Sequence, residues 1–149
     1  MLKEKLKIVK IKSEYINYLR KYDSKVEYNQ KELKKDNRPF IGILFNINNK
    51  SYYAPISSAN NNKKVKFGIM FEKYNKIGIS PIDIIFICDK NNNLLSVINL
   101  NNMIPVKEEN IIEYDILKDK NASLLIKEYI YCSKIRVEII RIALKIYSI

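Results

Sequence analysis

Apolar and polar residues alternate at the start of the chain. Residues 2–12 place Leu6, Ile8 and Ile11 among lysines, and this two-residue period predicts a strand with one wet face. Ser13 is the predicted N-cap of the helix that follows, because apolar residues recur after it at helical spacing over about ten positions. The chain is therefore expected to open with a strand and a helix.

A hairpin is predicted in the next part of the chain. A polar, lysine-rich loop over residues 23–38 leads to residues 40–47, whose β-branched and aromatic content favours a strand. Asn48-Asn49 then forms a turn into a second strand over residues 51–56. This second strand is expected to stop near Pro55, because proline cannot donate a hydrogen bond to a neighbouring strand.

Shorter elements are predicted in the second half. Residues 67–71 form a short apolar run that is interpreted as a strand. Residues 82–88 and 94–98 are two further strands, joined by a turn at residues 89–93. Residues 122–149 contain neither glycine nor proline, and their apolar residues recur near the helical period, which predicts a C-terminal helix.

These elements point to an α+β fold. The expected core is a twisted, mostly antiparallel sheet, with the N-terminal helix and a long C-terminal helix packed around it. The 149 residues are expected to form a single domain, residues 1–149. No apolar run is long enough to cross a bilayer and no secretory segment is apparent, so the prediction is a cytoplasmic protein without a membrane partner.

The charge balance points to a polyanionic partner. Lysine and arginine outnumber aspartate and glutamate by 27 to 16, giving a formal net charge of +11. Such a surface attracts nucleic acid, although an AT-rich genome also enriches a chain in lysine, asparagine, isoleucine and tyrosine. A non-catalytic basic module that binds RNA or DNA is one reading of this composition.

The residue types that are missing narrow the chemistry. The chain has no histidine, the commonest general acid or base and the commonest metal ligand. Cys88 and Cys132 lie far apart in apolar contexts, so they are interpreted as buried small hydrophobic residues. No metal and no cofactor is expected, and catalysis would depend on serine, tyrosine, lysine, arginine or carboxyl groups.

Three short blocks occur in a fixed order along the chain. They are Arg38–Ile43 (RPFIGI), Tyr53–Ser58 (YAPISS) and Ile98–Val106 (INLNNMIPV). Their sequences and spacing resemble the signature blocks of the ToxN/AbiQ toxin family, including its CptN-like branch. The resemblance also implies a twisted antiparallel sheet with helices packed around it.

The resemblance implies a function as well. It implies a sequence-specific, metal-independent endoribonuclease toxin of a type III toxin–antitoxin system, which cuts cellular or phage mRNA. The implied partner is an antitoxin RNA of pseudoknot repeats, which the toxin processes and which holds the toxin in a closed protein–RNA assembly. Phage defence by abortive infection is the expected role.

The family's serine pair matches Ser57 and Ser58, and the resemblance implies that activity requires Ser58. Without the flanking blocks, two serines at a strand end would indicate only a turn that hydrogen-bonds its own backbone. RNA cleavage without metal proceeds by attack of the 2′-hydroxyl and leaves a 2′,3′-cyclic phosphate. It needs groups that move protons and cations that stabilise the phosphorane.

The resemblance places the remaining catalytic candidates around this pair. Arg38 matches the family's basic position, and Lys63 and Lys64 follow the serines, although a solvated charge run is an equally good interpretation of these lysines. Tyr28 takes the family's tyrosine role only if its loop is rearranged, since an ungapped comparison puts that position on Lys34. The residues expected to bind RNA in one electropositive groove are Lys25, Lys31, Lys34, Lys35 and Lys66.

Overall fold

The computed structural model describes residues 5–23, 38–59, 61–62, 65–78, 81–118 and 123–148, and it confirms the α+β class with a mostly antiparallel sheet. The strands are β1 (Lys7–Ile11), β2 (Pro39–Gly42), β3 (Asn46–Ile47), β4 (Lys50–Ser58), β5 (Ile84–Cys88), β6 (Leu94–Asn99), β7 (Ile104–Val106) and β8 (Ile111–Ile112). The helices are α1 (Ser13–Arg20), α2 (Lys66–Ile77), α3 (Ser123–Lys134) and α4 (Arg136–Tyr147), with the 3-10 turns η1 (Leu100–Asn102) and η2 (Glu108–Asn110).

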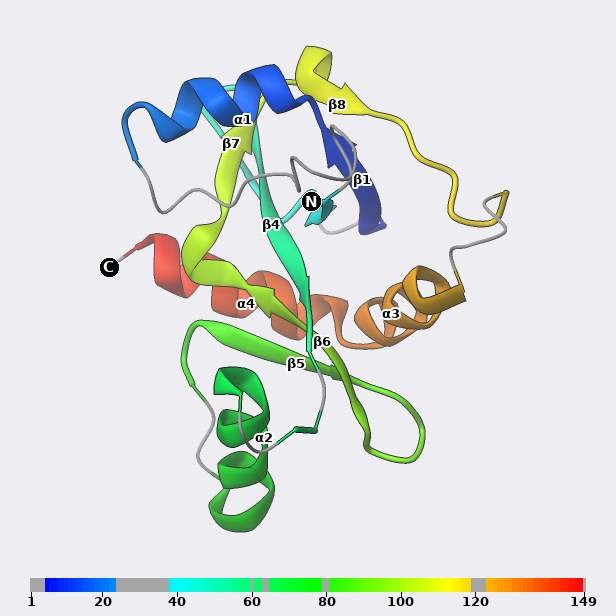
Figure 1. Cartoon of the computed structure of the whole chain (residues 1–149). Coiled ribbons are helices and arrows are strands. Elements are labelled where there is room, and N and C mark those ends of the chain that lie inside the picture. The colour runs from blue at the N-terminus through cyan, green and yellow to red at the C-terminus, as the bar shows by residue number, and fades with distance from the viewer. Residues whose placement is uncertain are drawn as a thin grey trace.

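Strand β4 is the centre of the sheet. The strand order is β5-β6-β4-β2-β1-β8, and β3 and β7 also pair with β4. Every described strand pair is antiparallel. In Figure 1, β4 runs through the middle of the molecule, with α1 near one end and α2 near the other. Residues 53–56 of β4 are all buried, as expected for a central strand that is covered on both faces.

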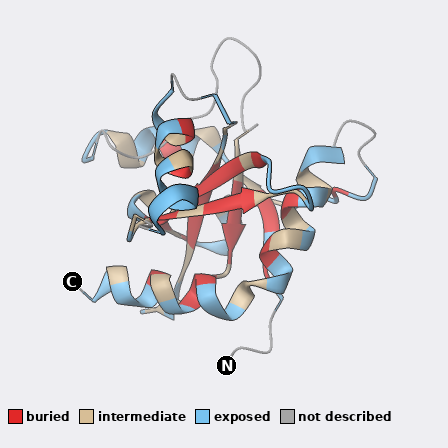
Figure 2. Cartoon of the chain, turned by 90° about the horizontal axis from the view of Figure 1, so that it is seen from below, coloured by how far each residue is buried: buried red, intermediate tan, exposed pale blue. Residues whose placement is uncertain are grey.

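The two faces of the sheet are covered by different helices. Ile41 and Ala54 belong to a core cluster that also contains residues of α3 and α4. Their chain neighbours Phe40 and Tyr53 point to the opposite face, where they pack with Ile16 of α1. Figure 2 shows the buried residues concentrated along the strands and on the inner sides of the helices. The two-residue period of a strand thus supplies both layers of the core.

The first predicted elements need two corrections. Ser13 is the first residue of α1 rather than its cap: Lys12 is the N-cap, and no side chain caps the helix. The predicted strand over residues 40–47 is divided into β2 and β3. Between β2 and β3 the chain stays paired with β4, because the Leu44 N–H donates a hydrogen bond to the Tyr52 carbonyl. The segment that joins β2 to β3 nevertheless has two more residues than the part of β4 opposite it, so the two strands pair with β4 in different registers.

The predicted turn at Asn48-Asn49 is confirmed, with φ angles of 54° and 65° that asparagine tolerates better than most residues. The predicted stop near Pro55 is wrong, because β4 continues to Ser58. On one side, β7 pairs with β4 up to Tyr53 and β6 pairs with it from Ile56. Pro55 lies where β4 changes neighbours, so its missing N–H interrupts neither ladder.

The predicted strand at residues 67–71 is also wrong, because this segment belongs to helix α2. Its apolar residues Phe67, Met70 and Phe71 have helical spacing and pack on one cluster with β5 and β6. The ring centroids of Phe71 and Phe86 are 5.2 Å apart. Packing against the sheet selects the helix, because so short an apolar run is compatible with either structure.

The remaining predictions agree with the structure in outline. Strands β5 and β6 and the turn between them are confirmed. The C-terminal segment is helical, and the structure divides it into α3 and α4 at Ile135, where φ is −109° and ψ is 21°. Among the described residues, no helix is both long and apolar enough to cross a membrane.

Candidate active site

A cavity of about 370 Å³ lies at the end of β4, between the start of β2 and the first turns of α3. Its lining residues are Arg38, Pro39, Ile56, Ser57, Ser58, Leu124, Leu125 and Glu128. Strand β2 begins at Pro39, so among the described residues no strand pairs with the last residues of β4 on that side. Three of the sequence-predicted catalytic residues therefore share one cavity: Arg38, Ser57 and Ser58.

Arg38 is fixed to the end of β4. Its Nη1 donates a hydrogen bond to Ser57 Oγ at 3.1 Å, and Nη1 also lies 3.5 Å from the carbonyl oxygen of Ile56. The register brings them together, since Phe40 pairs with Pro55 and the chain on either side continues antiparallel. A guanidinium held next to serine hydroxyls forms a group of hydrogen-bond donors suited to a phosphate.

Ser58 is the exposed end of this arrangement. It pairs with Ser96 of β6, which is fully buried. Ser58 lies two residues after Ile56 in β4, Ser96 lies two residues before Ile98 in β6, and both isoleucines belong to the cluster packed by α3 and α4. Ser58 and Ser96 therefore face α3.

Glu128 of α3 is a cavity residue that the sequence interpretation missed. It is one of two buried polar residues among those described, at 2% exposure, and Ser96 is the other. Burial raises the pKa of the Glu128 carboxyl above its ordinary value, and the nearby Ser96 hydroxyl offsets part of this rise. The sequence did contain a signal for this residue, because Glu128 lies between Leu125 and Cys132 on the apolar side of the predicted helix. Glutamate is rarely buried unless it has a polar partner, so a glutamate at such a position indicates a candidate site residue.

The other predicted site residues fall outside this cavity or outside the described chain. Lys66 begins α2, where its Nζ lies 5.7 Å from the centroid of the Phe67 ring, and it is not part of the cavity lining. Seven predicted residues lie outside the described residues: Tyr28, Lys63, Lys64, Lys25, Lys31, Lys34 and Lys35. Their roles stay predictions.

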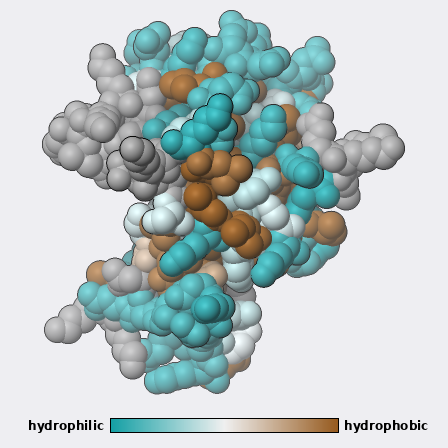
Figure 3. Space-filling model, turned by 90° about the vertical axis from the view of Figure 1, so that its right-hand side faces the viewer, coloured by the Kyte–Doolittle hydropathy of each residue, from teal (hydrophilic) through white to brown (hydrophobic). Residues whose placement is uncertain are grey.

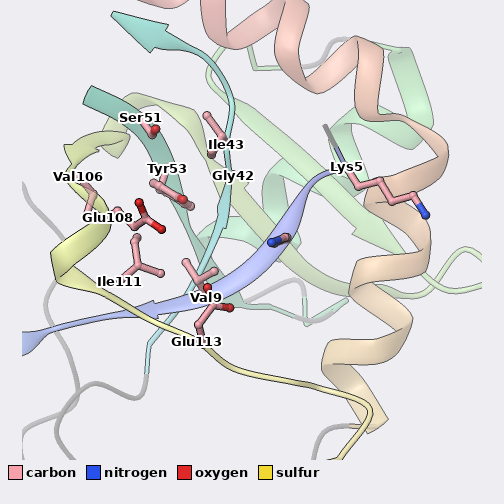
Figure 4. Close-up of a pocket in the computed structure, with 11 residues that line it drawn as sticks. Lys5, Val9, Gly42, Ile43, Ser51, Tyr53, Val106, Glu108, Ile111 and Glu113 are labelled. Atoms are coloured by element: carbon pink, nitrogen blue, oxygen red, sulfur yellow. The ribbon is translucent and has the colours of Figure 1, made fainter. Parts of the chain in front are cut away.

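A larger cavity, of about 560 Å³, opens elsewhere on the sheet (Figure 4). Tyr53 and Ser51 reach it from β4, and Glu108 and Glu113 reach it from the segment after β7. In Figure 4 the side chain of Lys5 points away from the other labelled residues. Its lining holds Lys5 and Lys7 as well as the two carboxylates, but it contains no arginine next to a serine pair, so this cavity is less suited to RNA cleavage than the arginine–serine cavity.

A third hollow, of about 350 Å³, lies between β1, residues 113–117 and α3. Its lining includes Ile8, Ile126 and Ile130. Figure 3 shows apolar side chains gathered in the middle of this side of the molecule, with polar ones around them. An apolar lining offers few donors to an anion, so this hollow is not a candidate catalytic site.

The cysteines do not contribute to the site. Cys132 is fully buried, as predicted, whereas Cys88 is only half-buried. Burial raises the pKa of the Cys88 thiol to about 11 and that of the Cys132 thiol to about 12. Both thiols are neutral at ordinary pH and form no disulfide. Within the described parts of the chain, no three His, Cys, Asp or Glu side chains are grouped so as to hold a metal ion.

The fold and the cavity define a class: an α+β protein whose central strand ends in a cavity lined by an arginine and two serines. The chain belongs to the family of ToxN toxins of type III toxin–antitoxin systems, whose model matches residues 7–149.

Two curated relatives carry endoribonuclease names. Endoribonuclease ToxN of Bacillus thuringiensis subsp. kurstaki is 32% identical over 137 residues, which cover 87% of this chain and 60% of the relative. Endoribonuclease AbiQ of Lactococcus lactis subsp. lactis is 29% identical over 136 residues, covering 91% of this chain and 70% of the relative. The chain thus matches 60% of the length of the Bacillus relative.

Solved structures show the same fold. One, reported with selective toxin inhibition by a non-coding RNA pseudoknot in type III systems, has a TM-score of 0.75 and 29% identity. The match covers 97% of this chain and 79% of that one. The structure of AbiQ, a lactococcal anti-phage endoribonuclease of a type III system, has a TM-score of 0.76 and 25% identity, covering 97% and 81%.

Proposed function

We propose that this protein is a sequence-specific endoribonuclease toxin that cuts cellular or phage mRNA in the cytoplasm without a metal ion. The observation that carries the proposal is the hydrogen bond from Arg38 to Ser57 inside a cavity that Ser58 also lines. Membership of the ToxN family supports it. The net charge of +11 supports it as well, because it draws RNA to the surface.

In the proposed reaction the ribose 2′-oxygen attacks the adjacent phosphorus, and the bond from phosphorus to the 5′-oxygen breaks. The 2′-hydroxyl loses its proton and the leaving 5′-oxygen gains one, which yields a 2′,3′-cyclic phosphate and a 5′-hydroxyl. Negative charge develops on the phosphate oxygens in the transition state. The Arg38 guanidinium and the hydroxyls of Ser57 and Ser58 stabilise this charge with donors that the fold holds in place.

The proposed regulation uses RNA. The toxin processes a repeat RNA antitoxin, and the resulting pseudoknots bind the toxin in a closed protein–RNA assembly that blocks cleavage. Pseudoknot inhibition of a similar toxin supports this part of the proposal, and the anti-phage role of AbiQ supports a role in abortive infection. The DNA next to the gene is then expected to contain a short tandem repeat array, whose co-expression restores growth of cells that produce the toxin.

Cleavage by purified protein tests the proposal. End-labelled RNA is incubated with the wild type, with Ser58→Ala and with Ser133→Ala, which removes an exposed serine of α3 outside the cavity. Wild type and Ser133→Ala should cut at the same sites, while Ser58→Ala should be slower by about 10²-fold or more, as expected when one donor to the transition state is lost.

The products and the metal requirement are measured in the same reactions. Each 3′ end should resist ligation until its cyclic phosphate is opened and the resulting phosphate is removed, and excess EDTA should leave the rate unchanged. If purified wild-type protein binds RNA without cutting it, the chain is a non-catalytic RNA-binding module. If Ser58→Ala cuts as fast as the wild type, the cavity at the end of β4 is not the active site.

A further inference from the structure

Glu128 of α3 is part of the lining of the proposed RNA-cleaving cavity, and its carboxyl lies beside the buried Ser96 hydroxyl. It lines the cavity together with Arg38, Ser57 and Ser58, although its residue is 2% exposed. The position on α3 agrees with this, since Cys132, one helical turn further on, packs in the cluster that also contains Ile56 and Ile98. Glu128 therefore forms the floor of the cavity, and Ser58 lies at its exposed rim.

The charge of Glu128 decides what the cavity can bind. An ionised carboxylate on the floor would repel a phosphate held by Arg38, and the repulsion would be strong because the group is buried. A protonated carboxyl has the opposite effect, because it donates one hydrogen bond to a phosphate oxygen. Burial raises the pKa of Glu128, and a bound phosphate would raise it further, because a nearby negative charge favours the neutral form.

We propose that Glu128 binds the RNA phosphate in its protonated form, donating a hydrogen bond to a phosphate oxygen from the floor of the cavity that Arg38, Ser57 and Ser58 line. This inference rests on the proposed function for the location of the RNA. The protonation state of Glu128 then decides whether RNA binds: the cavity accepts a phosphate diester only when the Glu128 carboxyl is neutral.

RNA binding should therefore take up a proton, and few other groups can supply this effect. The chain has no histidine. Of the described groups around Glu128, the serine hydroxyls carry no charge, and burial raises the pKa of the Cys132 thiol to about 12. The pKa of Glu128 is raised, whereas the pKa values of Asp89 and Glu138 are lowered.

Binding of an uncleavable RNA tests this. The probe is a fluorescent, mixed-sequence 2′-O-methyl oligonucleotide without terminal phosphates, so that it does not titrate between about pH 5.5 and pH 8.5. Its affinity for the wild type should fall with rising pH, with a limiting slope of about tenfold per pH unit. Glu128→Gln keeps a neutral donor of the same shape, so it should bind tightly with no such slope. Glu138→Gln removes an exposed carboxylate of α4 and should behave as the wild type.

Three results overturn the inference. They are a wild-type affinity that is absent or independent of pH, an equal slope in Glu128→Gln, and a loss of binding in Glu128→Gln at every pH, which would show that the ionised form is needed. If Glu128→Gln fails to fold, calorimetry of the wild type in buffers of different ionisation enthalpy measures the proton uptake directly, and zero uptake also overturns it.

This test is independent of cleavage. Proton-linked binding without any RNA cutting would refute the proposed nuclease and leave the role of Glu128 intact. RNA cutting by the wild type without proton-linked binding would refute the role of Glu128 and leave the proposed nuclease intact.

Discussion

Arg38 donates a hydrogen bond to Ser57 at 3.1 Å, across 19 positions of the sequence. The bond joins the residue just before β2 to Ser57, the last but one residue of β4. It holds the guanidinium at the open end of the central strand, where Ser58 and Glu128 also lie. The position of the positive charge in the proposed active site is therefore set by a bond within the protein, before any RNA binds.

Replacing Arg38 by lysine should slow RNA cleavage by about 10²-fold or more, because a lysine ammonium lacks the planar guanidinium that contacts Ser57 and the phosphate together. The rate is measured with end-labelled RNA under single-turnover conditions. Arg141→Lys, at the exposed Glu138 pair of α4, is the matched control and should keep the wild-type rate. Equal rates for the two variants would contradict the role of Arg38.

Gly42→Ala should destabilise the fold by about 1–3 kcal/mol, as overpacking in a core does. A Cβ at Gly42 would lie 2.5 Å from Cδ2 of the buried Tyr53 ring. Urea unfolding measures the loss. The same substitution in a Tyr53→Ala background should cost less, because the ring is gone. An equal cost in both backgrounds would show that the clash is not the cause.

Ile139→Ala should lower the free energy of unfolding by about 2–5 kcal/mol, because it empties part of a packed core. Ile139 of α4 is completely buried in the cluster beneath the sheet, whereas Val137, two residues away, is 62% exposed. Val137→Ala should change stability by no more than about 0.5 kcal/mol. A similar loss for both variants would mean that α4 packs by a different face.

Stability should depend on pH through Glu128. Its folded-state pKa is raised, so the folded protein holds this proton more tightly than the unfolded chain. The resulting stability is complete below the unfolded pKa of about 4.3 and is lost as pH rises through the folded-state value. Glu128→Gln, which does not titrate, should therefore gain stability over the wild type between pH 4 and pH 8 in thermal unfolding. A constant difference would contradict the raised pKa.

Both cysteines should react slowly with thiol reagents while the protein is folded. Burial raises the thiol pKa to about 11 at Cys88 and about 12 at Cys132. At pH 8 only about one Cys88 thiol in a thousand is then the reactive thiolate. Labelling should be faster at half-buried Cys88 than at Cys132, and both should label rapidly in urea, as peptide mapping by mass spectrometry can show. Rapid native labelling of Cys132 would contradict its burial.

The local pattern predicted much of the sheet. The strand β1, the asparagine turn and the paired strands β5 and β6 follow from short-range periodicity and turn chemistry, and the structure confirms them. The wet face predicted for β1 is wrong, because Ile8 is buried in one core cluster and Val9 in the cluster on the opposite face of the sheet. The segment at residues 67–71 was predicted as a strand and is a helix. Its five residues carry too little periodicity to choose between the two, and the choice comes from packing against Phe86.

The sequence by itself determined the strand periods, the basic charge, the absence of histidine and the three blocks that indicate the toxin family. Only the tertiary structure decided which residues meet at the site. Glu128 is 70 positions from Ser58. The helical period of residues 122–149 places Glu128 on a helix but does not indicate which residues it contacts. It reaches Arg38 and Ser58 because α3 packs over the end of β4. Such contacts depend on how distant elements pack, which no periodicity along the chain encodes.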